Sequence, residues 1–257
     1  MALIWGRHPV LEALRANRSV DRIYLAEGLR PVGILDEIVR LGSERGVQVQ
    51  FIDRKGLDRL ADGAVHQGVV ADVAEYRYHD LDDLASAQTL AGSWPLLVAL
   101  DALEDPQNFG TLLRTADAVG ATGVVIPLHR SVGVTAAVAK ASAGAIEFVR
   151  VARVTNLARS LGALKGRGYW VVGLDTGGSE QYTGFPIDVP LVLVVGAEGK
   201  GLGRLVKETC DTLVRLPMVG HVESLNAGVA GSVVLYDIVR RRGDLLRRPN
   251  RPPPPTG

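Results

Sequence analysis

Cysteine is nearly absent from this 257-residue chain, which contains Cys210 alone. A single cysteine excludes an internal disulfide and any zinc site built from several cysteines. Because free cysteines are usually buried, we expect Cys210 to be a small buried side chain on a helix.

Neither sign of charge dominates, since 29 Lys and Arg residues stand against 28 Asp and Glu residues, for a net charge of +1. The overall charge therefore does not indicate a nucleic-acid partner. Hydrophobic residues make up 47% of the chain and charged residues 22%. This composition is typical of a folded protein with a substantial core and excludes a disordered chain.

Long hydrophobic runs are also missing. The longest stretch without a charged residue, 84–100, is seventeen residues long and is broken by Ser, Gln, Gly and Pro, so it falls short of the ~18 apolar residues of a membrane-spanning helix. The N-terminal sequence lacks the basic flank, apolar segment and small-residue cleavage site of a secretory signal. These features predict a cytoplasmic protein with no membrane partner.

Residues 1–75 alternate between helix-like and strand-like segments and predict a small α/β domain. The helix-like segments are 9–16 and 34–41, and the strand-like segments are 20–25, 47–52 and 69–73. Residues 76–95 lose this alternation and gather acidic residues, Ser, Gly and Pro. Such a composition predicts a linker.

Six short apolar runs follow the linker, within a second predicted domain at 96–242. They are 96–100, 123–126, 146–151, 169–174, 191–195 and 212–216. The runs are continuous rather than alternating, and helix-like segments separate most of them. This pattern indicates an α/β domain whose parallel strands are buried on both faces, followed by a last helix at about 222–242.

The chain ends in a basic, proline-rich tail, residues 243–257. Six arginines and one aspartate lie within 240–257, for a local charge of +5. A basic tail can contact RNA phosphates. A solvated terminus explains the same composition equally well.

Common catalytic motifs are missing, although the chain has 30 glycines. The glycine-rich segment 196–203 has neither the Lys-Ser/Thr ending of a P-loop nor the spacing of a dinucleotide-binding loop. No G-x-S-x-G elbow occurs, and the five histidines lack metal-binding spacing, so no metal site is predicted. Among them, His221 in the loop before the last helix is a candidate for lying near a site.

Three segments stand out because each follows a predicted strand and mixes polar residues with glycine. Residues 101–116 read D-A-L-E-D-P-Q-N-F-G-T-L-L-R-T-A. Residues 196–202 read G-A-E-G-K-G-L, and residues 216–230 read L-P-M-V-G-H-V-E-S-L-N-A-G-V-A.

These segments resemble the three signature motifs of the SpoU/TrmH family of SPOUT RNA 2′-O-ribose methyltransferases. The motifs are N-x-G-x-x-x-R-x-A, then G-A-E-G-x-G-L, then L-P-M with S-L-N, and here they occur in that order. The opening G-R-H-P-V-L-E-A-L also resembles the start of the family's RNA-binding domain, so the resemblance spans about 4–242. Within the family, the chain is most similar to enzymes that methylate a guanosine of 23S rRNA in the peptidyl-transferase region.

The resemblance implies a ribosomal-protein-like N-terminal domain that binds RNA and a C-terminal SPOUT domain with a deep trefoil knot. The knotted loops would hold S-adenosylmethionine, and the knotted domain would form a homodimer. By the family pattern, the cofactor contacts Gly196, Leu216, Met218 and Leu225. The polar site around the target ribose comprises Asn108, Arg114, Glu198, Ser224 and Asn226. The sequence departs from the pattern at Ala227-Gly228, where the family usually has a small residue and then Ser, and we expect tighter packing there.

The chemistry of ribose methylation suggests roles for two of these residues. A 2′-hydroxyl is a poor nucleophile, so the reaction requires alignment and removal of a proton. We expect Arg114 to hold the target phosphate and stabilise the developing alkoxide, while Glu198 or water takes the proton. Structural alternatives remain, since Glu198 can brace its loop and Asn108 or Ser224 can cap a helix.

Basic residues near the first helix are candidates for contact with RNA phosphates. They are Arg7, His8, Arg15, Arg18 and Arg22. A solvated helix face is the alternative interpretation.

The sequence therefore predicts a methyltransferase that acts on 23S rRNA. One alternative is an enzyme that methylates tRNA ribose. The other is a non-catalytic RNA-binding assembly factor, and the joint presence of Asn108, Arg114, Glu198 and Asn226 argues against it.

Overall fold

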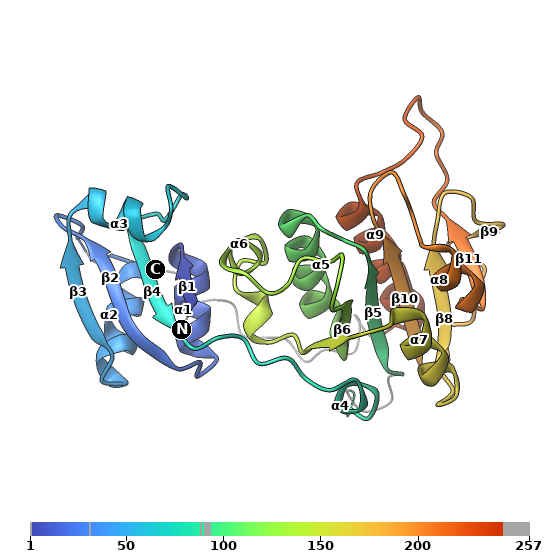
Figure 1. Ribbon diagram of the computed structural model, residues 1–257, viewed down its shortest axis with the longest axis horizontal. Helices are drawn as coiled ribbons and strands as arrows, with labels where there is room; N and C mark the ends of the chain where they lie inside the picture. The colour runs from blue at the N-terminus through green and yellow to red at the C-terminus, as the bar shows by residue number, and fades with distance from the viewer. Residues whose placement is uncertain (1, 31, 88, 90–93, 244–257) are drawn as a thin grey trace. The chain divides into compact units, whose positions relative to one another are not determined.

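The computed structural model describes residues 2–30, 32–87, 89 and 94–243 and divides them into two compact units (Figure 1). Residues 2–77 and 134–148 belong to the smaller unit, and residues 78–133 and 149–243 belong to the larger. The predicted tail lies outside the described residues, apart from residue 243. No helix in the described part of the chain is both long and apolar enough to cross a membrane.

The smaller unit contains a four-stranded sheet in the order β1-β4-β2-β3. Its strands are β1 (Ala2–Trp5), β2 (Val20–Ala26), β3 (Gln48–Ile52) and β4 (Val69–Val73), and its helices are α1 (Arg7–Arg15), α2 (Ile34–Glu44), α3 (Arg54–Leu60) and α6 (Ala136–Ala141). Ile23 of β2 approaches α2, whereas its neighbour Tyr24 packs with Leu57 of α3. Because successive side chains of a strand point to opposite faces, α2 and α3 cover opposite faces of this sheet.

The larger unit contains a seven-stranded sheet in the order β7-β6-β5-β10-β8-β11-β9, and every strand pair in it is parallel. The strands are β5 (Leu96–Asp101), β6 (Gly123–Pro127), β7 (Val151–Val154), β8 (Trp170–Leu174), β9 (Glu180–Gln181), β10 (Leu191–Gly196) and β11 (Thr212–Arg215). Residues 191–196 of the central strand β10 are all buried. The structure confirms the predicted α/β domain with a parallel sheet buried on both faces.

Helices cover the two faces of this sheet in different groups (Figure 1). They are α4 (Leu81–Ala85), α5 (Pro106–Val119), α7 (Leu157–Lys165), α8 (Arg204–Thr209) and α9 (Ala227–Arg242). Helices α4, α7 and α8 share a core cluster with Val192 and Val194 of β10. A Cβ on Gly231 of α9 would lie 2.6 Å from Leu112 of α5 and 3.0 Å from Val195 of β10. Gly231 therefore allows α9 to lie very close to α5 and to the opposite face of β10.

Local structure departs from the sequence predictions in several places. The predicted strand at 146–151 is wrong: residues 145–147 form a 3-10 turn, and β7 begins at Val151. Ile146 and Val149 are both buried, so the apolar run reflects burial rather than an extended backbone. The segments β1 and α3 also form although the sequence pattern did not indicate them.

Part of the predicted linker is packed into the larger unit. Residues 81–85 form α4, and Leu84 on this helix is fully buried in the core cluster with Leu97 and Val125. His79 makes an isolated parallel bridge with Ala152. The acidic residues that suggested a linker lie on the exposed side of this short helix.

Cys210 lies directly after α8 rather than within a helix, and its Sγ donates to the Val206 carbonyl at 3.2 Å. Burial raises the pKa of this half-buried thiol to about 12, and the nearby Asp211 carboxylate acts in the same direction.

The Cys210 thiol is therefore protonated at neutral pH, and the thiolate is the reactive form of cysteine. We expect iodoacetamide to label the folded protein at pH 8 at least ~100-fold more slowly than the urea-unfolded protein. Equal labelling rates in the two states would contradict this prediction.

Candidate functional site

The three motif segments meet at the carboxyl edge of the parallel sheet. Helix α5 begins shortly after β5, and the loop 197–203 follows the adjacent strand β10. The loop 216–226 leaves β11, rises at the upper right of Figure 1 and leads into α9. Parallel strands present their carboxyl ends at one edge of a sheet, so segments distant in sequence come together here.

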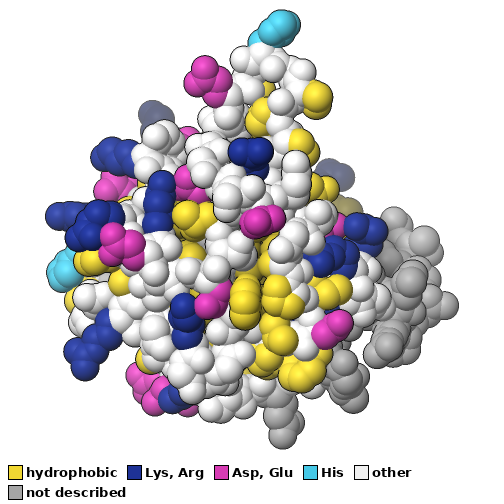
Figure 2. All heavy atoms as spheres, turned by 90° about the vertical axis from the view of Figure 1, so that its right-hand side faces the viewer, with side chains coloured by type: hydrophobic (Ala, Val, Ile, Leu, Met, Phe, Trp, Pro, Cys, Tyr) yellow, Lys and Arg dark blue, Asp and Glu magenta, His cyan; other side chains and the backbone are white. Residues whose placement is uncertain are grey.

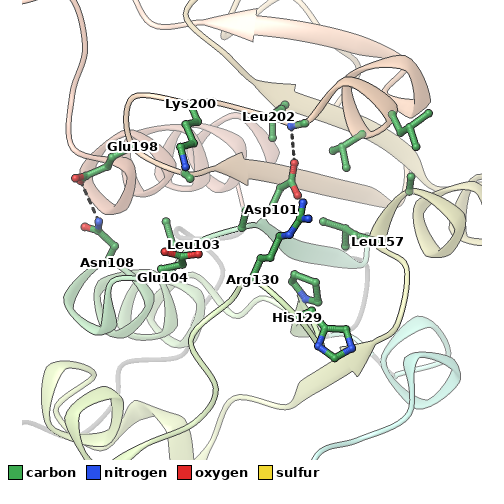
Figure 3. A pocket seen from close by; sticks show the side chains of 18 of the residues that line it. Asp101, Leu103, Glu104, Asn108, His129, Arg130, Leu157, Glu198, Lys200 and Leu202 are labelled. Carbon is green, nitrogen blue, oxygen red and sulfur yellow. Dashed lines mark hydrogen bonds between the residues drawn. The ribbon is translucent and has the colours of Figure 1, made fainter.

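Asn108, Glu198 and Asn226 connect all three segments by direct hydrogen bonds. Asn108 Nδ2 donates to Glu198 Oε1 at 2.9 Å, and Asn226 Nδ2 donates to the same oxygen at 2.5 Å. Asn226 Nδ2 also donates to Asn108 Oδ1 at 2.7 Å. The three residues therefore form a closed polar triangle, of which Figure 3 shows the Asn108–Glu198 side.

Asn108 is not the cap of its helix. Asp105 caps α5, because its carboxylate accepts the backbone N–H groups of Gln107 and Asn108. The Asn108 side chain is instead buried, and its amide bonds within the polar triangle. The capping alternative for Asn108 is therefore wrong.

The helix α9 is capped by Asn226 rather than by Ser224. Asn226 Oδ1 accepts the Val229 N–H at 3.1 Å, while its Nδ2 donates within the polar triangle. The helix consequently starts at Ala227, five residues later than the sequence pattern predicted. Ser224 lies exposed in the preceding loop.

Glu198 braces its surroundings as well as joining the polar triangle. Its Oε1 accepts the Ala227 backbone N–H at 3.3 Å in addition to the two amide donors. Three donors thus converge on Oε1, and within the described chain Oε2 accepts no hydrogen bond. The bracing alternative is confirmed, and it leaves Oε2 available to a ligand.

Arg114 lies on α5, six residues beyond Asn108. This spacing corresponds to roughly 9 Å along the axis and roughly 120° around it. The Arg114 side chain is exposed and makes no hydrogen bond or ion pair with any described residue. The structure therefore does not bring Arg114 into the polar triangle, and its guanidinium is free to bind a ligand.

Glycine permits the tight loop that carries Glu198. A Cβ on Gly196 would lie 2.4 Å from the backbone carbon of Gly201, which no side chain tolerates. Gly199 and Gly201 have φ values of 71° and 62°, in the left-handed region that favours glycine. An isolated bridge between Ala197 and Gly201 closes the loop.

The loop 216–226 exposes apolar side chains. Leu216 is half-buried, whereas Met218 and Leu225 are exposed, as are Val219 and Val222. Figure 2 shows the projection at the top of this face, which carries hydrophobic side chains among polar ones. His221 is also exposed in this loop.

Two aspartates that the sequence analysis did not select brace the loop after β10. Asp101 Oδ2 accepts the Gly203 N–H at 2.7 Å, and Asp175 Oδ2 accepts the Leu202 N–H at 3.5 Å. Each aspartate ends or follows a parallel strand, β5 or β8. A carboxylate at the carboxyl end of a predicted parallel strand was therefore the feature of the sequence that could have indicated these two residues.

Asp175 also forms an ion pair with Lys207 at 2.8 Å. Burial alone raises the pKa of its carboxyl group, but Lys207 and the backbone N–H groups of Gly177 and Leu202 outweigh burial and hold the pKa below its ordinary value. A lowered folded-state pKa stabilises the fold above the unfolded-state pKa of about 4, and this stabilisation is lost as the pH falls through the folded-state pKa.

Asp175→Asn is therefore expected to lower the free energy of unfolding at pH 7 by about 1–3 kcal/mol. The difference from the wild type should shrink below pH 4. Urea unfolding at pH 7 and at pH 3 measures both values. An equal loss at the two pH values would argue against the charge as its origin.

The basic residues near α1 that are candidates for contact with RNA differ in whether they already form ion pairs within the protein. Arg15 contacts Glu12 at 2.9 Å and Glu37 at 2.8 Å, and its hydrogen bond with Glu37 is the main reason that its pKa is raised. The Arg7 backbone N–H and Nε both bond to Gln67. His8 is exposed at the start of α1.

Two further arginines occupy structural positions in the smaller unit. Arg18 bonds to Glu147 at 2.6 Å and to the Ala74 carbonyl, and Arg22 lies over the Tyr24 ring at 5.9 Å. The basic group therefore includes internal ion pairs, and its contact with RNA stays a prediction. Within the described residues, no group of three or more His, Cys, Asp or Glu side chains is arranged to hold a metal ion.

Two family models match the chain over most of its length. The model described as "SpoU rRNA Methylase family" matches residues 95–236. The model described as "RNA 2'-O ribose methyltransferase substrate binding" matches residues 3–79. The larger match contains the whole polar triangle and Arg114.

Curated relatives match the chain over nearly their whole length. The chain is 49% identical to the Bacillus subtilis protein described as "Putative TrmH family tRNA/rRNA methyltransferase YacO", over 92% of this chain and 94% of that protein. It is 46% identical to a protein of Staphylococcus haemolyticus with the same family description, over 93% and 96% of the two chains.

Solved structures that superpose on this chain also include RNA-modifying enzymes. An AdoMet-bound rRNA methyltransferase from Sinorhizobium meliloti superposes with a TM-score of 0.76 and 26% identity, covering 93% of this chain and 87% of that one. The A. aeolicus TrmH/SpoU tRNA-modifying enzyme superposes with a TM-score of 0.54 and 26% identity, covering 64% and 83%. Together with the matched motifs and domains, these similarities show that the chain belongs to the SpoU/TrmH family of RNA methyltransferases.

Proposed function

We propose that the chain transfers a methyl group from S-adenosylmethionine to the ribose 2′-hydroxyl of a guanosine in 23S rRNA, in the peptidyl-transferase region. The observation that carries this proposal is the polar triangle, because it unites one residue from each family motif at the carboxyl edge of the sheet. The free guanidinium of Arg114 supplies a cation in the same unit.

Coverage by the solved structures favours rRNA over tRNA. The S. meliloti rRNA methyltransferase aligns with 93% of the chain, whereas the A. aeolicus tRNA-modifying enzyme aligns with 64%. The shorter alignment is too short to include both matched domains. The description tRNA/rRNA methyltransferase of the bacterial relatives keeps tRNA as the alternative substrate.

The loops after β10 and β11 fit S-adenosylmethionine. The tight turn after Gly196 presents backbone groups, and the exposed Met218 and Leu225 offer apolar surface for an adenosine. We propose that the backbone of Gly196, Leu216 and Leu225 and the Met218 side chain hold the cofactor, in loops knotted as the family resemblance implies. The cofactor supplies the electrophilic methyl group.

The chain's own side chains would position the ribose and move its proton. Asn108 and Asn226 hold Glu198 Oε1 in place, which leaves Oε2 to accept the 2′-hydroxyl proton. Arg114 would bind the target phosphate and stabilise the developing alkoxide. Ser224 is exposed two residues before Asn226, and it would donate a hydrogen bond to the ribose.

The decisive experiment incubates the full chain with radiolabelled S-adenosylmethionine and unmodified transcripts of either 23S rRNA or tRNA. Label at one guanosine of 23S rRNA, located by ribose-methylation-sensitive sequencing, is the expected result. Label on tRNA would refute 23S rRNA as the substrate and would still support the methyl-transfer reaction. Cofactor binding without label on either RNA would favour the non-catalytic assembly factor.

We also propose a homodimer through the larger unit. Val229, Val233 and Tyr236 are exposed on α9 although they are apolar or aromatic. Their spacing places them on one side of the helix. A strip without charge on the last helix suits a second copy of the same surface, as a two-fold interface requires.

Val233→Asp is expected to shift the protein from dimer to monomer, because an aspartate buried at the centre of this strip would lack a partner. Analytical ultracentrifugation measures the change in mass. Val32→Asp, on an exposed apolar residue of the smaller unit, is the matched control. A wild-type monomer, or a dimer that survives the first substitution, would refute this interface.

A further inference from the structure

A cavity of about 660 Å³ opens beside the polar triangle, within the larger unit (Figure 3). Its lining residues lie at the carboxyl ends of four parallel strands, within 101–105 at β5, 127–130 at β6, 156–158 at β7 and 197–206 at β10. Asn108 and Glu198 form part of its wall. Volumes of this size are typical of small-molecule sites.

Charged side chains of both signs line this cavity. Arg130 and Lys200 supply positive charge from the loops after β6 and β10, and Asp101 and Glu104 supply negative charge from the segment after β5. In Figure 3, Arg130 extends toward Asp101, and Glu104 lies between Arg130 and Asn108 in this view.

Four carboxylate residues line the cavity, of which Asp105 caps α5 and Glu198 belongs to the polar triangle. The other two, Asp101 and Glu104, differ in what they already bind. Asp101 Oδ2 is occupied by the Gly203 N–H. Glu104 is exposed, and no described residue donates a hydrogen bond to it or pairs with its charge. Glu104 therefore has two free acceptor oxygens facing the cavity.

The backbone is strained at two points of the cavity wall. Ala102 and Arg130 have φ values of 56° and 57°, in a region that residues other than glycine rarely adopt. Each follows a central strand of the sheet, and strained residues concentrate at ligand sites because function maintains them. Asn17, Asp62, Gln67 and Ala143 adopt the same region elsewhere, so the strain supports a ligand site here only together with the cavity and its charges.

We propose that this cavity binds the base of the target nucleoside and that Glu104 selects guanine. The inference rests on the proposed function in one respect, namely that the ribose of that nucleoside lies at Glu198. Because Glu198 and Asn108 line the same cavity, a base bound inside it would leave its ribose at the polar triangle. Arg130 and Lys200 would then contact the flanking phosphates.

The free carboxylate of Glu104 matches guanine better than the other bases. The Watson–Crick edge of guanine presents two adjacent donors, N1–H and the N2 amino group, which fit two acceptor oxygens. Adenine and cytosine each place an acceptor beside a donor, and uracil presents one donor between two acceptors. RNA enzymes commonly read an unstacked base by this edge, so a carboxylate with two free oxygens there discriminates in favour of guanine.

Glu104→Gln tests this assignment, because it keeps the size of the side chain and replaces one acceptor by a donor. Binding is measured on the ¹⁵N-labelled full chain by NMR titration with guanosine 5′-monophosphate and adenosine 5′-monophosphate. We expect the guanine nucleotide to bind the wild type about tenfold more tightly and to shift the amide signals of residues 102–104 and 130. The substitution should weaken binding of the guanine nucleotide about tenfold and should not weaken binding of the adenine nucleotide.

Asp188→Asn is the matched control, since it removes the same charge from an exposed loop that does not line the cavity. It should bind both nucleotides as the wild type does. Equal binding of the two nucleotides by the wild type, or an unchanged preference in Glu104→Gln, would overturn the proposal.

A transfer assay separates this inference from the proposed function. Labelled RNA from the incubation is digested to nucleosides, and 2′-O-methylguanosine should carry the label and fall at least about tenfold in Glu104→Gln. Methylguanosine in tRNA would refute the rRNA substrate and support the role of Glu104. Label in a different nucleoside would refute the role of Glu104, whichever RNA carries it.

Discussion

Glu198→Gln is expected to reduce methyl transfer by about 10²–10⁴-fold, the range typical for loss of a general base. Glutamine has the same shape but takes a proton poorly. Its carbonyl oxygen can still accept from Asn108 Nδ2 and Asn226 Nδ2, which donate to Glu198 Oε1, while its amide group replaces Oε2. Single-turnover transfer with saturating S-adenosylmethionine measures the chemical step.

The pH dependence of the variant distinguishes proton removal from positioning. If Glu198 takes the proton, the wild-type rate should rise with pH through an ionisation that the variant lacks. If Glu198 only braces Ala227 and the two amides, the variant should keep the wild-type profile at a lower rate. Transfer within a factor of two of the wild type would refute proton removal by Glu198.

Arg114→Ala is expected to reduce transfer by about 10²–10³-fold, as loss of one donor to a developing oxyanion does. The side chain is exposed and makes no bond to a described residue, so the free energy of unfolding should change by no more than about 0.5 kcal/mol. Affinity for S-adenosylmethionine, measured by calorimetry, should also stay close to the wild-type value.

Arg150→Ala is the matched control for this substitution. Arg150 is also exposed but precedes β7, at the opposite edge of the sheet from the polar triangle. It should retain nearly full transfer. Equal turnover by Arg114→Ala and the wild type would exclude the role assigned to Arg114.

Sequence patterns predicted the layered parallel sheet well, because continuous apolar runs report directly on strands buried on both faces. The failure at 146–151 has a physical reason: Ile146 and Val149 are buried by a turn, and hydrophobicity alone does not distinguish a turn from a strand. The short helix α4 was missed because its buried residue Leu84 stands among acids.

The motifs predicted five polar residues for the site. Three of them, Asn108, Glu198 and Asn226, form hydrogen bonds with one another. The motifs did not predict which amide bonds to which oxygen, because those bonds depend on strand order: β10 lies between β5 and β8. The sequence pattern did not distinguish Asp101, Asp175 and Glu104, because single carboxylates after strands are common. Their importance depends on the loop and cavity beside them.

The polar triangle ties residues 108, 198 and 226 together, and this has a consequence for biosynthesis. A ribosome releases the chain from its N-terminus onward, so α5 emerges long before the residues that complete the triangle. Bonds between such distant positions form slowly compared with local ones. A nascent chain can thus fold its smaller unit early, yet it acquires catalytic competence only after Asn226 and the start of α9 have been made.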